Sequence, residues 1–177
     1  MSVLRTRIVG IIVLALVGFG SSSGEKDPFQ TNDGRAAFAV LRQLAGTWKL
    51  TDPKTQRAAG LRISYRMISG DSALVETFRH TDGEPTETIY HLDGDRLMAT
   101  HYCAQGNQPR LRLTSFDGKG TLEFRFFDAT NLAKDSDSHM IRMKFQILDG
   151  THMSKEEIYS EDAKEDVTTL SLEKTEQ

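Results

Sequence analysis

Residues 86–109 read TETIYHLDGDRLMATHYCAQGNQP, and this stretch decides the fold that we expect. Two runs of alternating side chains, residues 86–92 and 96–103, flank the dipeptide Asp93-Gly94. Alternating runs on either side of Asp-Gly are typical of a tight β-hairpin. The stretch therefore predicts two antiparallel strands joined by a two-residue turn.

The position of this turn predicts which side chains share a face of the hairpin. With Leu92 and Asp95 on either side of the turn, alternation gathers one mostly uncharged set on one face. The set consists of Thr86, Thr88, Tyr90, Leu97, Ala99, His101 and Cys103. Because only a protonated His101 would bring a charge to this face, we expect the set to point into the protein.

The N-terminal residues have the pattern of an export signal. Arg5 and Arg7 precede an apolar run over residues 8–19, and small residues follow the run. The apolar run is short for a membrane span, so we expect no stable span after cleavage; a retained anchor is the alternative. We expect an exported protein, periplasmic or secreted, with a signal peptide over residues 1–20, a flexible tether over 21–32 and a barrel domain over 33–177.

The charge and the cysteine content of the chain bear on its partners and on its disulfides. Loss of Arg5 and Arg7 with the leader moves the formal net charge from -3 to -5. A chain with this acidic balance lacks the basic surface that neutralises phosphates, so nucleic acid is not an expected partner. Cys103 is the single cysteine, so it has no disulfide partner within the chain, and we expect its thiol to be buried.

Beyond one predicted helix over residues 34–44, the side chains alternate with a period of two. We expect ten strands, at residues 48–51, 61–67, 73–80, 86–92, 96–103, 110–116, 121–127, 140–148, 151–159 and 167–174. Short strands joined by tight turns favour an antiparallel up-and-down barrel, because closure leaves no free edge. The predicted fold class is all-β, a barrel of about ten strands with one short N-terminal helix.

A second hairpin, around Asp149 and Gly150, predicts which polar side chains enter the barrel. Its first strand has one clearly apolar face, which must point inward. A two-residue turn would bring three polar residues to this face: His152, Ser154 and Glu156. A buried carboxylate is costly without a partner, so Glu156 is expected to be paired or to line a cavity. A slip of one residue, which would instead bury Met153 and Tyr159, remains open.

At residues 44–48, LAGTW, the chain resembles the lipocalins and related calycin barrels. In those families a short helix precedes a first strand carrying Gly-x-Trp, and the tryptophan plugs one end of the barrel. A basic residue on the last strand packs over it; here Lys174 is available where an arginine is usual. About ten strands fit the fatty-acid-binding proteins and nitrobindin-like barrels better than the eight strands of lipocalins. Residues 90–110 also resemble a stretch of uncharacterised exported bacterial proteins of lipocalin-like type.

The resemblance implies a cup that binds a small amphipathic or hydrophobic molecule. The alternative from another class is a barrel filled by its own side chains, acting as a structural or protein-interaction module. Nitrobindin-like barrels hold haem through a histidine, which makes haem on His101 a third possibility. Cavity volume distinguishes the first two readings.

The candidate ligand-binding residues are those that the hairpins and apolar faces direct inward. They are Trp48, Thr88, Tyr90, His101, Cys103, Phe124, Ser154 and Glu156. His101 and Cys103 lie two apart on one face, but two ligands do not make a zinc site. Side chains at this spacing are also about 6–7 Å apart, too far for a nucleophile and its base. We therefore assign no metal site, no catalytic residue and no specific cofactor.

Overall fold

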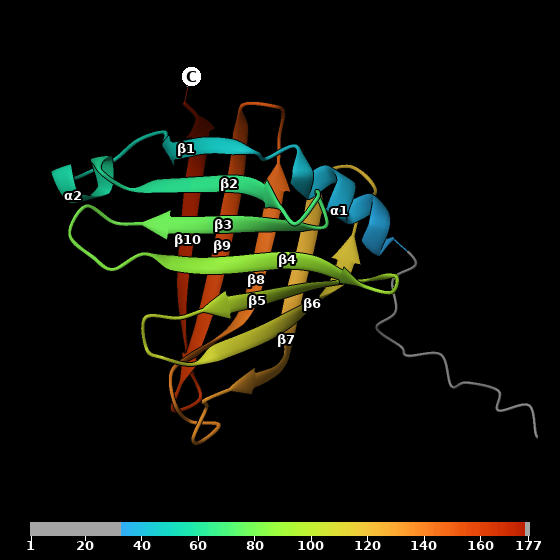
Figure 1. The fold of residues 1–177 in the computed structure, drawn as a ribbon. Helices are drawn as coiled ribbons and strands as arrows, with labels where there is room; N and C mark the ends of the chain where they lie inside the picture. Colours follow the sequence, from blue (N-terminus) through green and yellow to red (C-terminus); the bar gives the residue numbers. More distant parts are fainter. Residues whose placement is uncertain (1–32, 176–177) are drawn as a thin grey trace, which may run out of the picture.

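The computed structural model describes residues 33–175 and forms a closed barrel of antiparallel strands (Figure 1). In chain order the elements are α1 (Gly34–Arg42), β1 (Gly46–Leu50), α2 (Gln56–Ala59), β2 (Arg62–Ile68), β3 (Ala73–Arg79), β4 (Thr86–Asp93), β5 (Arg96–Tyr102), β6 (Gln108–Phe116), β7 (Thr121–Thr130), β8 (His139–Ile147), β9 (His152–Glu161) and β10 (Lys164–Lys174). Each strand pairs with its neighbours in the chain, and β1 pairs with β10 to close the barrel.

The predicted all-β, ten-stranded, up-and-down barrel is confirmed, and so is the helix that precedes it. The sequence did not predict α2, a single helical turn between β1 and β2. Within the described range, no helix is long and apolar enough to cross a membrane. The expected signal peptide and tether lie outside the described residues.

Helix α1 covers one end of the barrel, where β4 turns into β5 (Figure 1). Its side chains Phe38 and Leu41 are buried in the hydrophobic core. Gly34 lies so close to the turn that a Cβ there would be 2.1 Å from the carbonyl oxygen of Asp95. Arg35 forms an ion pair with the Asp95 carboxylate at 2.7 Å. The helix is therefore fixed against the β4–β5 hairpin by packing, close approach and charge.

Trp48 lies at this covered end, as the calycin resemblance implied. Its side chain is fully buried, and its Nε1 donates a hydrogen bond to the carbonyl oxygen of Leu44 at 2.8 Å. Lys174 pairs with Trp48 across β1 and β10 and places its ammonium 5.6 Å from the Trp48 ring centroid. The same ammonium donates to the Gln43 carbonyl oxygen at 3.4 Å. Lys174 thus occupies the place expected for the basic residue of the last strand.

The β4–β5 hairpin differs from the expected one by the position of its loop. The two loop residues are Gly94 and Asp95, not Asp93 and Gly94. Gly94 has a φ of +62°, which suits glycine at the first position of a two-residue turn. The opposing partners change by two residues, so Thr88 pairs with His101 and every side chain keeps its face. The residues of the expected inward set that are buried are Thr88, Tyr90, Leu97, Ala99 and His101.

The β8–β9 hairpin has the alternative register, the slip of one residue. Ile147 pairs with Met153, and Phe145 pairs with Lys155. Met153 is buried and Tyr159 is half-buried and packs against the core. The expected inward placement of three residues was wrong: His152, Ser154 and Glu156.

The turn of this hairpin explains the slip. Asp149 Oδ1 accepts hydrogen bonds from the backbone N–H groups of Thr151 and His152, at 2.7 and 2.8 Å. The N–H of Leu148 donates to the His152 carbonyl oxygen at 3.0 Å. These bonds stabilise a connection wider than a two-residue turn. Because side chains alternate along a strand, a change of one residue in register turns the whole of β9 over.

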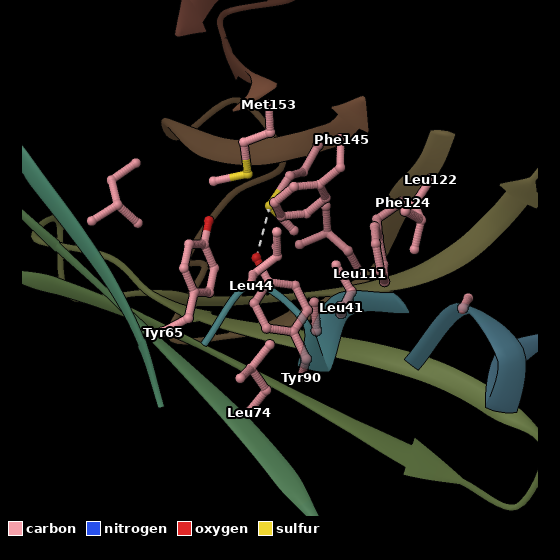
Figure 2. Packing of buried hydrophobic residues seen from close by; sticks show 14 of the residues in the cluster. Leu41, Leu44, Tyr65, Leu74, Tyr90, Leu111, Leu122, Phe124, Phe145 and Met153 are labelled. Carbon is pink, nitrogen blue, oxygen red and sulfur yellow. Dashed lines mark hydrogen bonds between the residues drawn. The ribbon is translucent and has the colours of Figure 1, made fainter. Parts of the chain in front are cut away.

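Large side chains fill the middle of the barrel (Figure 2). Tyr90, Phe124 and Phe145 are fully buried, and their ring centroids lie 5.9, 6.0 and 6.4 Å apart in edge-to-face contacts. The Tyr90 hydroxyl oxygen also lies 3.2 Å from Met143 Sδ, the contact that the dashed line marks in Figure 2. This part of the interior is a packed core.

Candidate functional site

An open cavity of about 820 Å³ lies at the end of the barrel opposite α1. It is bounded by the β3–β4, β5–β6 and β7–β8 connections and by the β9–β10 hairpin, which share one end in an up-and-down barrel. Leu61, Phe78 and Leu170 give the cavity apolar walls, and Glu157 and Tyr159 add polar groups. Its volume is within the range of small-molecule sites, roughly 300–1,000 Å³.

The mouth of the cavity is strongly acidic. Lys164 is the only lysine among the lining residues. The carboxylates around it belong to Glu84, Glu161, Asp162, Glu165 and Asp166. Arg142 offsets part of this charge through a 3.7 Å contact with Glu165. The field at the entrance therefore favours cations over anions.

A buried ion cluster lies between the packed core and the cavity. Lys155, which is fully buried, donates hydrogen bonds from Nζ to Glu76 Oε1 and, at 2.6 Å, to Glu157 Oε1. The hydroxyl of Tyr90 donates to the other Glu76 oxygen, Oε2, at 2.7 Å. Lys155 Nζ also lies 5.6 Å from the centroid of the Phe145 ring. The cluster thus runs from Tyr90 in the core to Glu157 at the cavity.

Lys155 and Glu157 stay charged in spite of burial. Burial acts to lower the pKa of Lys155, but the carboxylates of Glu157 and Glu76 outweigh it and raise this pKa above its usual value. Burial acts to raise the pKa of Glu157, but the Lys155 ammonium outweighs it and lowers this pKa. Burial, then the Glu76 charge, raises the pKa of Tyr90. Its hydroxyl therefore stays protonated and serves as a donor.

His101 forms a second, neutral chain of hydrogen bonds. Its Nδ1 lies 2.9 Å from Thr88 Oγ1, and its Nε2 lies 3.0 Å from the hydroxyl of Tyr159. Burial lowers the pKa of His101 from 6.5 to about 4, although the Glu157 carboxylate opposes part of this shift. His101 is therefore uncharged at neutral pH.

This geometry does not suit haem ligation by His101. An axial histidine needs a ring nitrogen free to bind the iron. Both nitrogens of His101 are hydrogen-bonded inside the barrel, and His101 does not line the cavity. Among residues 33–175, no group of three or more His, Cys, Asp and Glu side chains is placed to hold a metal ion.

The structure distributes the eight candidate residues over three environments. Fully or almost fully buried in the interior are Trp48, Thr88, Tyr90, His101 and Phe124. Cys103 is half-buried and lines the cavity, where its thiol donates to Gln105 Oε1 at 2.9 Å. Ser154 and Glu156 pair with Gln146 and Lys144 on the outer face, and neither lines the cavity.

The sequence interpretation missed Glu76, Lys155 and Glu157. Glu76 lies between Leu74 and Phe78 at a spacing of two, so alternation alone would have placed it on their inward face. Lys155 and Glu157 alternate with Met153 and Tyr159, the residues that the slipped register buries. The alternative register of the sequence analysis therefore already placed Lys155 and Glu157 on the inward face.

Comparison with known proteins adds no assignment. The chain matches no protein-family model, and no curated protein sequence matches it. The architecture, a closed ten-stranded antiparallel barrel with a helix leading into a buried Trp48, is consistent with the calycin type.

Proposed function

We propose that this protein is an exported barrel that binds a small amphipathic or hydrophobic molecule in the cavity opposite α1. The observation that supports the proposal is the cavity itself. Its volume of about 820 Å³, its apolar walls at Leu61, Phe78 and Leu170, and the polar groups of Glu157 and Tyr159 suit a ligand with an apolar body and a polar end.

The alternative, a barrel filled by its own side chains, describes only the half of the interior next to α1. Trp48, Tyr90, Phe124 and Phe145 occupy the interior between α1 and the ion cluster. A ligand in the open half needs no space in that core. The proposal therefore places the ligand between the cluster and the mouth.

The experiment is a titration with N-phenyl-1-naphthylamine, an uncharged apolar dye whose fluorescence rises in apolar surroundings. We expect saturable binding of one dye per chain. Thr168→Trp should abolish it, because Thr168 lines the cavity and the indole would occupy the space. Thr169→Trp is the matched control, because the next residue of β10 points to the opposite face.

Two results would overturn the proposal. One is a wild-type protein that binds no dye. The other is equal binding by the wild type and a folded Thr168→Trp variant, since the dye would then occupy some other surface.

A further inference from the structure

Glu157 is an incompletely paired carboxylate that lines the cavity. Only 9% of its surface is exposed, and its Oε1 accepts the hydrogen bond from Lys155. Within residues 33–175, no hydrogen bond to its other oxygen, Oε2, is formed. Glu76, in contrast, uses both of its oxygens, one with Lys155 and one with Tyr90.

The buried cluster also carries one more negative charge than positive charge. Two carboxylates, those of Glu76 and Glu157, share the single ammonium of Lys155. The neighbouring imidazole of His101 is neutral at pH 7 and adds no cation. A net negative charge in a site largely removed from water is costly unless a counter-ion approaches it. The cavity is the side from which a counter-ion can arrive.

The walls near this carboxylate suit an organic cation better than a hydrated inorganic ion. Phe78 and the His80 ring, whose centroids are 4.9 Å apart, line the cavity together with Tyr159. Aromatic faces attract ammonium groups, and the apolar walls match a hydrocarbon body. The acidic mouth would also draw cations inward and repel anions.

We propose that the cavity selects molecules carrying a positively charged nitrogen on an apolar body, with Glu157 as the partner of that nitrogen. This inference rests on the proposed function and narrows it to organic ammonium ligands. The positive charge of the ligand would neutralise the second carboxylate, which the single ammonium of Lys155 leaves without a counter-ion.

The test compares three ligands with the same ten-carbon chain, each below its micelle-forming concentration: decyltrimethylammonium, decanol and decanoate. Each displaces N-phenyl-1-naphthylamine from the purified protein. We expect the ammonium compound to bind at least about tenfold more tightly than decanol, because only the ammonium compound carries the charge that Glu157 attracts; a tenfold ratio corresponds to about 1.4 kcal/mol. Decanoate should bind most weakly.

Two variants locate the effect at Glu157. Thr168 lies opposite Glu157 across β9 and β10 and lines the cavity. Thr168→Lys therefore supplies an ammonium to this carboxylate and should remove the preference for the cationic ligand. Thr169→Lys, which faces Glu156 on the outer side, is the control and should keep the preference. Glu157→Gln should act like Thr168→Lys; if it fails to fold, the lysine variants still decide.

The outcomes separate the two proposals. Dye binding without a preference for the ammonium compound, or with a preference for decanoate, overturns the inference and leaves the binding cavity standing. An unchanged preference in folded Thr168→Lys also overturns it. If neither the dye nor any of the three ligands binds, the proposed function itself fails.

Discussion

Lys155 and Glu76 form an ion pair inside the barrel, although 79 positions separate them in the chain. The pair joins β9 to β3 across the interior, where neither side chain has access to water. Glu157 on one side and Tyr90 on the other extend the pair into a cluster. This cluster is the boundary between the packed core and the open cavity, so it bears on both stability and binding.

Lys155→Met is expected to destabilise the protein by about 3–5 kcal/mol, because it leaves two buried carboxylates without their cation. Urea unfolding followed by circular dichroism measures the loss. Lys144→Met, an exposed position on the neighbouring strand β8, is the control and should change stability by less than about 0.5 kcal/mol. A loss below about 1 kcal/mol for Lys155→Met would show that the cluster contributes little.

Trp48→Ala is expected to cost about 3–5 kcal/mol, because it removes a fully buried indole and leaves a cavity beside α1. Lys174→Met keeps most of the packing but removes the cation over the ring. It should cost only about 0.5–1 kcal/mol. Thermal unfolding of both variants measures the difference. If both lose the same amount, the cation rather than the indole holds this end together.

Much of the fold was predictable because it rests on local patterns. Alternation along each strand and the turn residues between strands predicted the ten-stranded barrel. At the β4–β5 hairpin the loop was predicted one residue too early. The predicted faces of Thr88, Tyr90 and His101 were still right, because the opposing partners moved by two residues. At the β8–β9 hairpin, Asp149 holds a wider turn. The shift of one residue moved Ser154 and Glu156 outside.

The candidate site was less predictable because it depends on contacts between distant strands. Glu76 makes the inward face of β3 look mixed in sequence, and only its partner on β9 explains why a charge is tolerated there. Lys155 has one of its carboxylates, Glu157, two residues away on the same strand, but the other, Glu76, is 79 positions away and cannot be identified from the local sequence. Only Cys103, of the eight candidates, lines the cavity, because the other inward side chains belong to the packed core or its border.

Stability is expected to fall as the pH drops from about 6.5 to about 4, because of His101. The unfolded chain binds a proton on this histidine with a pKa near 6.5, whereas burial lowers the folded pKa to about 4. The contribution is complete above the first value and is lost as the pH falls to the second. At 1.36 kcal/mol per pKa unit the loss is about 3 kcal/mol.

Urea unfolding at several pH values across this window tests the slope. His101→Gln should flatten it, whereas His91→Gln, on the opposite face of the same hairpin, should leave it unchanged. The hydrogen bonds to Asp149 lower its pKa to about 2, so the stability that it contributes is lost only below about pH 4, outside this window. An unchanged slope in His101→Gln would contradict the assignment.

A bound ligand is expected to protect Cys103 from thiol reagents. Cys103 is the single cysteine of the chain and lines the open cavity, where its thiol donates to Gln105. With N-phenyl-1-naphthylamine at about ten times its Kd, only about one protein in eleven is free, so the reaction with Ellman's reagent should slow about tenfold.

The control is the double variant Cys103→Ser, Thr169→Cys, which moves the only thiol to the outer face of β10. Its reaction rate should not respond to the dye. Protection in both proteins would mean that the dye itself inhibits the reagent, and protection in neither would place the bound dye outside the cavity.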